Sequence, residues 1–441
     1  MMCLRGNALH KEKMFQNGIK KNFNLKLVIT LICILQSPSA YAYIDPGTGS
    51  ALVYVVTGIV VSAYFAMRSL YYRIIELFFR IRFKYNHCSI AVHSEDPRYE
   101  ISFMPILEEL VKHGVDVTYF TMYERNASFD TLPPGVLHVP IPAGMVGYAY
   151  LNNLRATVLA TTTIQLDVMI FKRSKNVKHY VAVSHALGES RYVRPFAYDY
   201  FDSVFCCGPI LKNNIRKMEK IRGLPSKRLF ETGIPHYQSL ITYAEHAQKP
   251  GKKCTVLISP SWGPLSMFET IGTDFIKNIA DHFNVIIRPH PQMKISQPEL
   301  YQQILLLDNV VVDTARTPSE SMSKSHIMLS DISSIVYEFA FIYQRPALII
   351  DQEQYDGGLE AEVLGNGPTL KESSQSFIIP FPPVEIDGIA DKIKDTLFSY
   401  SAQGIAIKRD ELLYNFDRGA TTAALQLIEL YQHEYKKIIH M

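Results

Sequence analysis

The sequence lacks most of the local signatures that identify nucleotide-binding and metal-binding proteins. Its six cysteines include no CxxC pair, so neither a zinc site nor a disulfide framework is indicated. It has no G-x-x-x-x-G-K-[ST] loop and no Gly-x-Gly-x-x-Gly after a strand-like run, which argues against the common glycine-rich phosphate sites. Its 45 Lys and Arg residues against 42 Asp and Glu residues give a formal charge of +3, too balanced to indicate nucleic acid as a partner.

The length of the chain predicts more than one domain. A single hydrophobic core stops growing at about 250–300 residues, so 441 residues predict two domains and an appendage. Hydrophobic residues make up 47% of the sequence, a globular value with an excess concentrated near the N-terminus.

The first 85 residues predict a membrane anchor. Basic residues, the short apolar run Leu27–Leu35 and a small-residue cleavage pattern identify residues 1–42 as a signal peptide or a first hydrophobic segment. A second run, from Ala51 to about Leu70, has the length of a membrane-spanning helix. Basic residues follow it within 43–85 and indicate a cytoplasmic flank. We therefore expect a protein of the inner (cytoplasmic) membrane whose catalytic part is cytosolic.

The remainder of the chain alternates between strand-like and helix-like patterns, beginning with Cys88–His93, Tyr99–Lys112 and Val115–Phe120. Such alternation predicts an α/β protein with parallel, doubly wound sheets. A Lys- and Gly-rich break near residues 247–253 divides the pattern into two Rossmann-like halves, 86–247 and 252–441. The last two helical segments are expected to close the second half.

Three polar motifs follow apolar strand-like runs in the second half: Ser259-Pro260-Ser261-Trp262, Arg288-Pro289-His290-Pro291 and Ser330-Asp331-Ile332-Ser333-Ser334. The carboxyl ends of parallel strands face one crevice, which is where ligands of open α/β sheets bind. The motifs therefore predict one site, suited to an anionic ligand such as a nucleotide or a phosphate ester.

The order and the residues of these motifs resemble those of the CDP-glycerol glycerophosphotransferase family, whose members build teichoic-acid-type polyol phosphates. The resemblance covers about residues 180–400 and extends weakly to His185 and to Gly233-Ile234-Pro235. It implies the two-domain architecture called GT-B in glycosyltransferases, with an acceptor domain followed by a nucleotide donor domain.

The third motif precedes a helix-like segment, whose N-terminus binds phosphate readily. Its serines could equally be ordinary helix caps. The resemblance favours binding, and it implies two groups of donor contacts. The donor phosphates are assigned to Arg288, Ser330, Asp331, Ser333 and Ser334. The vicinity of the donor nucleotide is assigned to Ser259, Pro260, Ser261, Gly233 and Glu338.

Two histidines are candidates for catalysis. His290 lies between two prolines and beside Arg288, where it could stabilise or protonate the phosphate of the departing nucleotide. His185 follows an apolar strand-like run and could take a proton from an acceptor hydroxyl. Each could instead be a structural histidine at a strand end. Arg191 and Arg194 are candidates for binding the acceptor.

The sequence departs from the family pattern in several places. His236 stands in place of an arginine and Tyr237 in place of an asparagine, and the lysine that follows the first histidine in the family is missing after His185. These departures leave the identity of the donor and acceptor open.

We expect a membrane-anchored transferase that moves glycerol phosphate, or a related polyol phosphate, from CDP-glycerol or a similar donor to a cell-envelope glycan or lipid-linked acceptor. One alternative is a GT-B nucleotide-sugar glycosyltransferase of capsule or lipopolysaccharide synthesis. Another is a non-catalytic nucleotide-binding envelope protein. No residue pattern requires a cofactor or a metal, and the sequence leaves open whether a divalent cation assists.

Overall fold

The computed structural model describes residues 54–67, 69–71, 74, 87–125, 131–331, 333–351 and 358–439. The chain forms two compact units, Met1–Ile74 and Ile75–Met441. The signal-like segment 1–42 and the basic residues predicted to follow the membrane helix lie outside the described residues.

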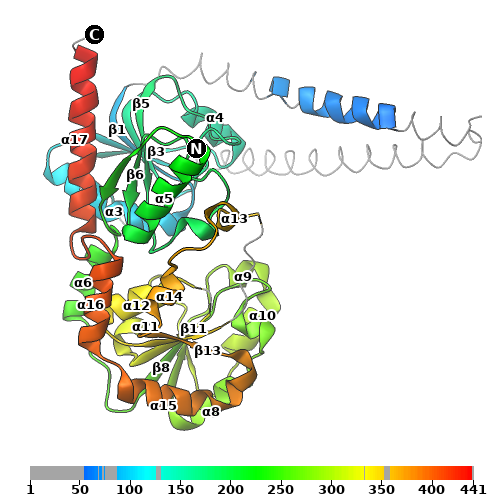
Figure 1. The fold of residues 1–441 in the computed structure, drawn as a ribbon, viewed down its shortest axis with the longest axis vertical. Helices are drawn as coiled ribbons and strands as arrows, with labels where there is room; N and C mark the ends of the chain where they lie inside the picture. The colour runs from blue at the N-terminus through cyan, green and yellow to red at the C-terminus, as the bar shows by residue number, and fades with distance from the viewer. Residues whose placement is uncertain are drawn as a thin grey trace, which may run out of the picture. The chain divides into compact units, whose positions relative to one another are not determined.

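The first unit contains the helix predicted from the second apolar run. It spans Tyr54–Tyr71 and is long and apolar enough to cross a membrane, with none of its apolar window buried inside the protein (Figure 1). Its large apolar side chains, such as Ile59 and Phe65, are exposed. Its length and composition agree with the expected span.

The first half of the second unit is built on a parallel seven-stranded sheet of order β3-β2-β1-β4-β5-β6-β7. Its strands are β1 (Cys88–Ser94), β2 (Val117–Thr121), β3 (Val136–Pro140), β4 (Ala156–Thr161), β5 (Val177–Val183), β6 (Ser203–Cys206) and β7 (Arg228–Glu231). Its helical segments are η2 (Pro97–Tyr99), α3 (Glu100–Lys112), α4 (Met145–Leu151), η3 (Ser190–Tyr192) and α5 (Pro209–Arg222). The next helix, α6 (Tyr237–His246), follows β7 and packs mainly on helices of the second half.

The second half is built on a parallel six-stranded sheet of order β10-β9-β8-β11-β12-β13. Its strands are β8 (Thr255–Ser259), β9 (Asn284–Ile287), β10 (Val311–Val312), β11 (Ile327–Ser330), β12 (Ala347–Ile350) and β13 (Ile378–Phe381). Its first helices are α7 (Met267–Thr270), α8 (Phe275–His282), α9 (Met293–Ser296), α10 (Pro298–Leu305), α11 (Ser319–Lys324) and α12 (Ile335–Tyr343). The later ones are α13 (Ala361–Leu364), α14 (Leu370–Ser374), η4 (Pro383–Gly388), α15 (Ile389–Ser399) and α16 (Ala402–Leu412).

Both sheets are doubly wound, as the alternating pattern predicted. The strand order reverses between β1 and β4 in the first sheet and between β8 and β11 in the second. Their central strands are buried along most or all of their length, as expected where helices cover both faces of a parallel sheet. One buried apolar cluster contains both Leu159 of the first half and Leu257 and Phe339 of the second. The two halves therefore share one continuous hydrophobic core cluster.

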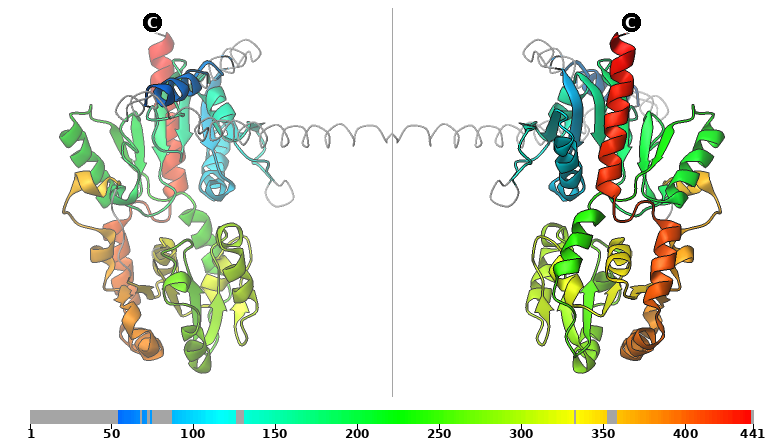
Figure 2. Two further views of the ribbon diagram at one scale, coloured as in Figure 1. Left: turned by 90° about the vertical axis from the view of Figure 1, so that its right-hand side faces the viewer. Right: turned by 90° about the vertical axis from the view of Figure 1, so that its left-hand side faces the viewer.

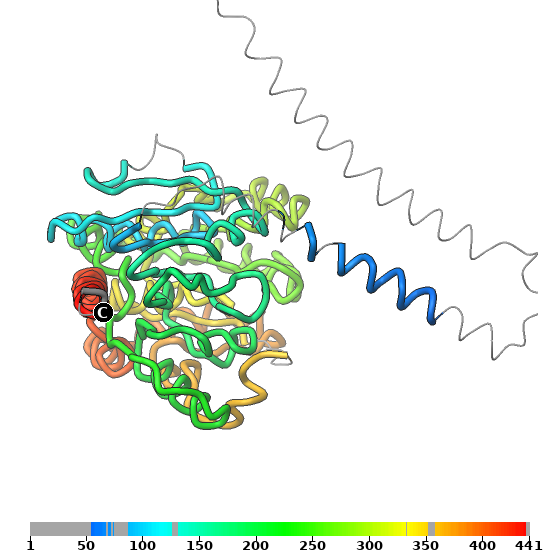
Figure 3. Tube along the Cα trace, turned by 90° about the horizontal axis from the view of Figure 1, so that it is seen from above, coloured from blue at the N-terminus to red at the C-terminus, as the bar shows by residue number. Residues whose placement is uncertain are grey.

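The last helix, α17 (Gly419–Ile439), packs on the first half and not on the second, which corrects the sequence-based expectation. Its buried residues Ala420, Ala423, Leu427 and Leu430 belong to the same apolar cluster as α3, β1 and β4. Figures 1 and 2 show this helix in red alongside the first sheet, and Figure 3 shows it nearly end-on. The small side chains at its start let it approach α3 closely, so this helix returns the chain to the first half.

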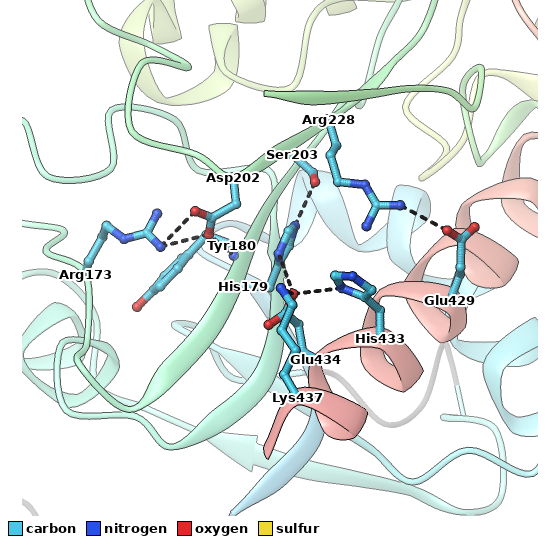
Figure 4. Close-up of polar contacts among 10 residues, drawn as sticks. All are labelled: Arg173, His179, Tyr180, Asp202, Ser203, Arg228, Glu429, His433, Glu434 and Lys437. Atoms are coloured by element: carbon cyan, nitrogen blue, oxygen red, sulfur yellow. Dashed lines mark hydrogen bonds and ion pairs between the residues drawn. The ribbon is translucent and has the colours of Figure 1, made fainter. Parts of the chain in front are cut away.

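Polar contacts attach the outer end of α17 to the amino-terminal ends of β5, β6 and β7 (Figure 4). The Nε2 atom of His179 lies 2.7 Å from the Ser203 hydroxyl, and its Nδ1 atom lies 3.9 Å from the Glu434 carboxylate. Burial lowers the pKa of His179. Arg228 pairs with Glu429 at 3.0 Å. These contacts position the helix.

Gly233 occupies the point where the returning chain crosses the first half. Its φ is +79°, and an added Cβ would lie 2.1 Å from the Tyr414 carbonyl oxygen. The glycine therefore permits a close approach between the end of β7 and the segment that joins α16 to α17. Its position in the fold explains the residue without any contact to a nucleotide.

Gly233→Ala should destabilise the protein by more than about 1 kcal/mol, because a Cβ meets both an unfavourable φ and a backbone clash. Gly114→Ala is the matched control, since Gly114 has a φ of +68° and a Cβ added there would have nothing within 4 Å. Thermal unfolding of the two full-length variants should show a clearly larger loss for Gly233→Ala. Equal losses of thermal stability in the two variants would mean that the segment around Tyr414 moves to accommodate the added Cβ at little cost.

Candidate active site

The three polar motifs lie at the carboxyl ends of three adjacent strands. The motif strands β9, β8 and β11 are neighbours in the sheet, and Ser259 pairs directly with Ser330. The strand order reverses between β8 and β11, which is where open α/β sheets bind ligands. The structure thus brings the motifs together, as their sequence positions predicted.

Ser330 and Asp331 hold the loops of the site together from inside. The Ser330 hydroxyl donates to the Ser259 carbonyl oxygen at 2.5 Å. The fully buried carboxylate of Asp331 accepts from the backbone N–H groups of Ser261 and Met267, each at 2.8 Å. Burial raises the pKa of Asp331. Both residues therefore position the first motif, including Pro260, and their polar atoms are directed into the protein.

Arg288 is also engaged within its own half. Its Nη1 donates to Asp313 at 2.7 Å and its Nη2 donates to the Ala315 carbonyl oxygen at 2.8 Å. The side chain is buried and holds the loop that follows β10. The charge predicted to grip the donor phosphates is therefore committed to Asp313.

His290 presents a neutral hydrogen-bond donor. Its Nδ1 accepts from the backbone N–H of Gln292 at 3.1 Å, so the neutral ring carries its proton on Nε2. Burial, with the nearby charges of Arg98 and Arg288, lowers the pKa of His290 to about 4. Trp262 lies beside the ring, with the two centroids 6.1 Å apart. A neutral Nε2–H suits stabilisation of a phosphate oxygen.

Ser333 and Ser334 stand at the start of α12. Ser334 is exposed and its side chain makes no capping bond, while the Ser333 hydroxyl accepts from Ile335 N–H only at 3.4 Å. The interpretation of these serines as ordinary caps therefore has little support. The helix N-terminus and the two hydroxyls remain suited to an anion.

His185 faces these serines across a cavity of about 490 Å³ between the two halves. The centroid of its ring lies 4.6 Å from the centroid of the Tyr99 ring. The ring is accessible within the cleft, although protein atoms surround it, and burial together with the charges of His236 and Arg98 lowers the pKa of His185 to about 4. The rest of the cavity wall is largely apolar, and it includes Leu187, Tyr192, Tyr198, Leu265, Tyr337 and Ile349.

Glu338 and Arg191 have partners within the protein, whereas Arg194 is exposed. Glu338 pairs with His236 Nε2 at 3.1 Å, a contact that joins the two halves. Arg191 donates to the Gly365 carbonyl oxygen of the second half. Arg194 is exposed. These contacts give Glu338 and Arg191 a part in holding the halves together.

Sequence reasoning missed the turn that connects β1 to α3. In this turn Arg98 pairs with Asp96 through two bonds, at 2.9 and 3.0 Å, and Tyr99 contacts His185. The signal was an Asp-Pro-Arg sequence directly after a strand-like run, which is the same kind of strand end that identified the other motifs. Among the described residues no group of three or more His, Cys, Asp or Glu side chains could hold a metal ion.

Several solved structures share the overall fold of this chain. The chain is similar to a histidine variant of the wall teichoic acid polymerase TagF, with a TM-score of 0.54 and 14% identity over 90% of this chain and 100% of that one. A TagF variant soaked with CDPG gives a TM-score of 0.51 and 14% identity, covering 89% and 100%. The UDP-GlcNAc 2-epimerase from Neisseria meningitidis, bound to UDP-GlcNAc, gives 0.50 and 13%, covering 79% and 100%. No protein-family model and no curated protein sequence matches the chain.

These likenesses show the fold. The two parallel-sheet halves form a GT-B-type architecture. The motifs resemble the CDP-glycerol glycerophosphotransferase family, and the TagF structures found by the fold comparison agree with that resemblance.

Proposed function

We propose that the protein transfers glycerol phosphate, or a related polyol phosphate, from a CDP-activated donor to a hydroxyl of a cell-envelope acceptor. The observation that carries the proposal is the cavity that joins His185 of the first half to Ser333 and Ser334 of the second. A base on one wall and an anion-binding helix start on the other suit a reaction in which a hydroxyl attacks a phosphorus atom.

In the proposed reaction the acceptor oxygen attacks the β-phosphorus of the donor. The new P–O bond forms as the bond to the CMP oxygen breaks, and the hydroxyl proton passes to neutral His185. His290 donates from Nε2 to the phosphate oxygens of the departing CMP. Ser333, Ser334 and the backbone at the start of α12 hold the donor phosphates. The contribution of the protein is positioning and charge stabilisation, as is usual in phosphoryl transfer.

The Tyr54–Tyr71 helix supports a proposal that the protein is anchored in the cytoplasmic membrane with its second unit in the cytosol. Nucleotide-activated donors are made in the cytosol, so this topology would give the cleft access to them. A reporter fused after the last residue should be active only in the cytosol.

Release of nucleotide from a panel of donors tests the proposed function. The detergent-purified protein should release CMP from CDP-glycerol, because transfer of a substituted phosphate leaves the nucleoside monophosphate. Release of UDP from a UDP-sugar would instead support the nucleotide-sugar glycosyltransferase, because one fold can host different reactions. Binding without turnover of any donor would favour the non-catalytic alternative.

The pH dependence of the reaction should show an acid-tolerant base. A general base with a pKa of about 4 stays unprotonated to well below pH 6, whereas a histidine with the ordinary pKa of about 6.5 would be about 90% protonated at pH 5.5. We expect kcat/KM for CDP-glycerol at pH 5.5 to stay within about twofold of its value at pH 7.5. A tenfold loss over this range would contradict a lowered pKa for the base, because it is the loss that a histidine of ordinary pKa would show.

A further inference from the structure

The proposed donor would bring a charged diphosphate into a cleft in which little positive charge is available to bind it. Both candidate histidines have a pKa of about 4, so they are neutral near pH 7. Arg288 is bonded to Asp313, and Arg191 is bonded to the Gly365 carbonyl. The cations that the motifs supply therefore serve the fold, and a cation facing the phosphates has to come from another part of the chain.

Arg98 stands in the required place. It belongs to η2, the short turn directly after β1, and its neighbour Tyr99 packs on the ring of His185. Its side chain is about half exposed. The guanidinium lies 6.0 Å from the centroid of the Tyr99 ring, which contacts His185. Burial is the main cause of the low pKa of His185 and of His290, and the charge of Arg98 adds to it at both rings. Arg98 therefore lies beside the candidate base, at the carboxyl end of β1.

Asp96 holds the guanidinium of Arg98 in a fixed orientation. Its two carboxylate oxygens accept from Nε at 2.9 Å and from Nη2 at 3.0 Å, and Oδ1 also accepts from the Arg98 backbone N–H. An arginine has five side-chain N–H donors, and this pairing uses two of them. The remaining edge of the guanidinium has the fork geometry that matches phosphate oxygens.

Other cations near the cleft are paired with residues that hold the fold. Arg316 lies 3.8 Å from Glu100 of α3. Lys371, which lines the cavity, is bonded to Asp351 of its own half. These pairs link or brace elements, whereas Asp96 and Arg98 are two residues apart in one turn, so their pairing braces only that turn.

We propose that Arg98, oriented by Asp96, is a phosphate-binding residue of the cleft and contacts the diphosphate of the nucleotide donor from the first half of the protein. This inference rests on the proposed function for the identity of the donor. It adds a cation from the first half to a phosphate site otherwise built from the second. Asp96 is a positioning residue, because it acts only through Arg98.

The first test compares Arg98→Gln with wild type, using inorganic pyrophosphate as the binding probe and CDP-glycerol as the substrate. Arg98→Gln should bind pyrophosphate about 10- to 100-fold more weakly, the loss expected for a hydrogen bond between charged groups. Arg155→Gln is the matched control, because Arg155 is exposed and lies at the amino-terminal end of β4, whereas Arg98 follows the carboxyl end of β1. It should bind as wild type does.

The second test measures the position of Arg98 without any ligand. Nuclear magnetic resonance titration of histidine-labelled protein, assigned with His185→Asn and His290→Asn, should show a higher pKa for both histidines in Arg98→Gln. A merely local role for Arg98 would leave His290 unchanged. Arg98→Lys should keep both pKa values low because it keeps the charge, and it should recover only part of the pyrophosphate affinity because it lacks the fork.

The outcomes separate this inference from the proposed function. Loss of pyrophosphate binding in Arg98→Gln supports the inference even if wild type releases no CMP from CDP-glycerol, a result that would refute the function alone. Equal pyrophosphate affinity in wild type and Arg98→Gln, or none in wild type, would overturn the inference while CMP release could still support the function. Arg98 is half exposed, so the variants should fold, and matching thermal unfolding will verify this.

Discussion

Replacing His185 or His290 with alanine should lower turnover of CDP-glycerol by about 10²- to 10⁴-fold, the usual cost of removing a group that moves or stabilises a proton in the transition state. The melting temperature should change little, because neither ring is part of the apolar core. His185 lines the cavity, and His290 is half-buried beside Trp262. Initial rates of CMP release, measured beside thermal unfolding, provide the check.

The two variants should differ in substrate binding. His290→Ala should also weaken binding of the nucleotide, because its Nε2–H is assigned to the donor phosphate, whereas His185→Ala should leave it unchanged. His246→Ala is a suitable control, since His246 is exposed at the end of α6. Wild-type rates in both cleft variants would place catalysis elsewhere.

Replacing Glu360 with alanine should have the largest effect on stability, about 3 kcal/mol or more, because removing one member of a buried charged network typically costs about 3–5 kcal/mol. Glu360 is fully buried and its carboxylate accepts from Arg222 of α5 and, at 2.6 Å, from the backbone N–H of Phe196. Arg222 also pairs with Asp199 at 2.8 Å, and burial raises the pKa of Asp199 although Arg222 opposes this. Thermal or denaturant unfolding of the variant measures the loss.

The loss should be concentrated at the contact between the halves. Glu360 precedes α13, which packs on η3 and α5 of the first half, and Lys217 donates to the Leu364 carbonyl oxygen at the end of that helix. Glu360→Ala should therefore make residues 358–366 more sensitive to limited proteolysis at temperatures below global unfolding. Glu362→Gln is the control, because Glu362 is exposed in the same segment. Equal proteolysis of the two variants would show that the Glu360 network does not hold this segment.

These contacts bear on catalysis as well as stability. His185 and Ser333 come from different halves, so the geometry of the site depends on how firmly the halves are joined. The Glu360–Arg222 network and the His236–Glu338 pair are two places where that joint is made. A variant that loosens either contact should lower turnover without touching the donor.

Much of the fold could be predicted from local patterns. The strand predicted at Cys88–His93 lies within β1, and the helix predicted at Tyr99–Lys112 coincides with α3 to within one residue. β4 was missed, because its Ala-Thr-Val-Leu-Ala-Thr sequence combines small and apolar residues without the alternation that marks a half-buried strand. It lies in the centre of the first sheet, where burial on both faces removes that alternation.

The sequence by itself determined that two parallel sheets form and that polar motifs meet at their strand ends, because both follow from local periodicity and chain direction. Only the tertiary structure decided what each polar group does there. Asp331 and Arg288 turn inward to partners that chain folding brings to them, Arg98 pairs with Asp96 and stays half exposed, and α17 returns to the first half. Hydrogen-bond partners and packing surfaces are set by distances in space, and residues that lie far apart in sequence carry no local pattern that reveals their contact.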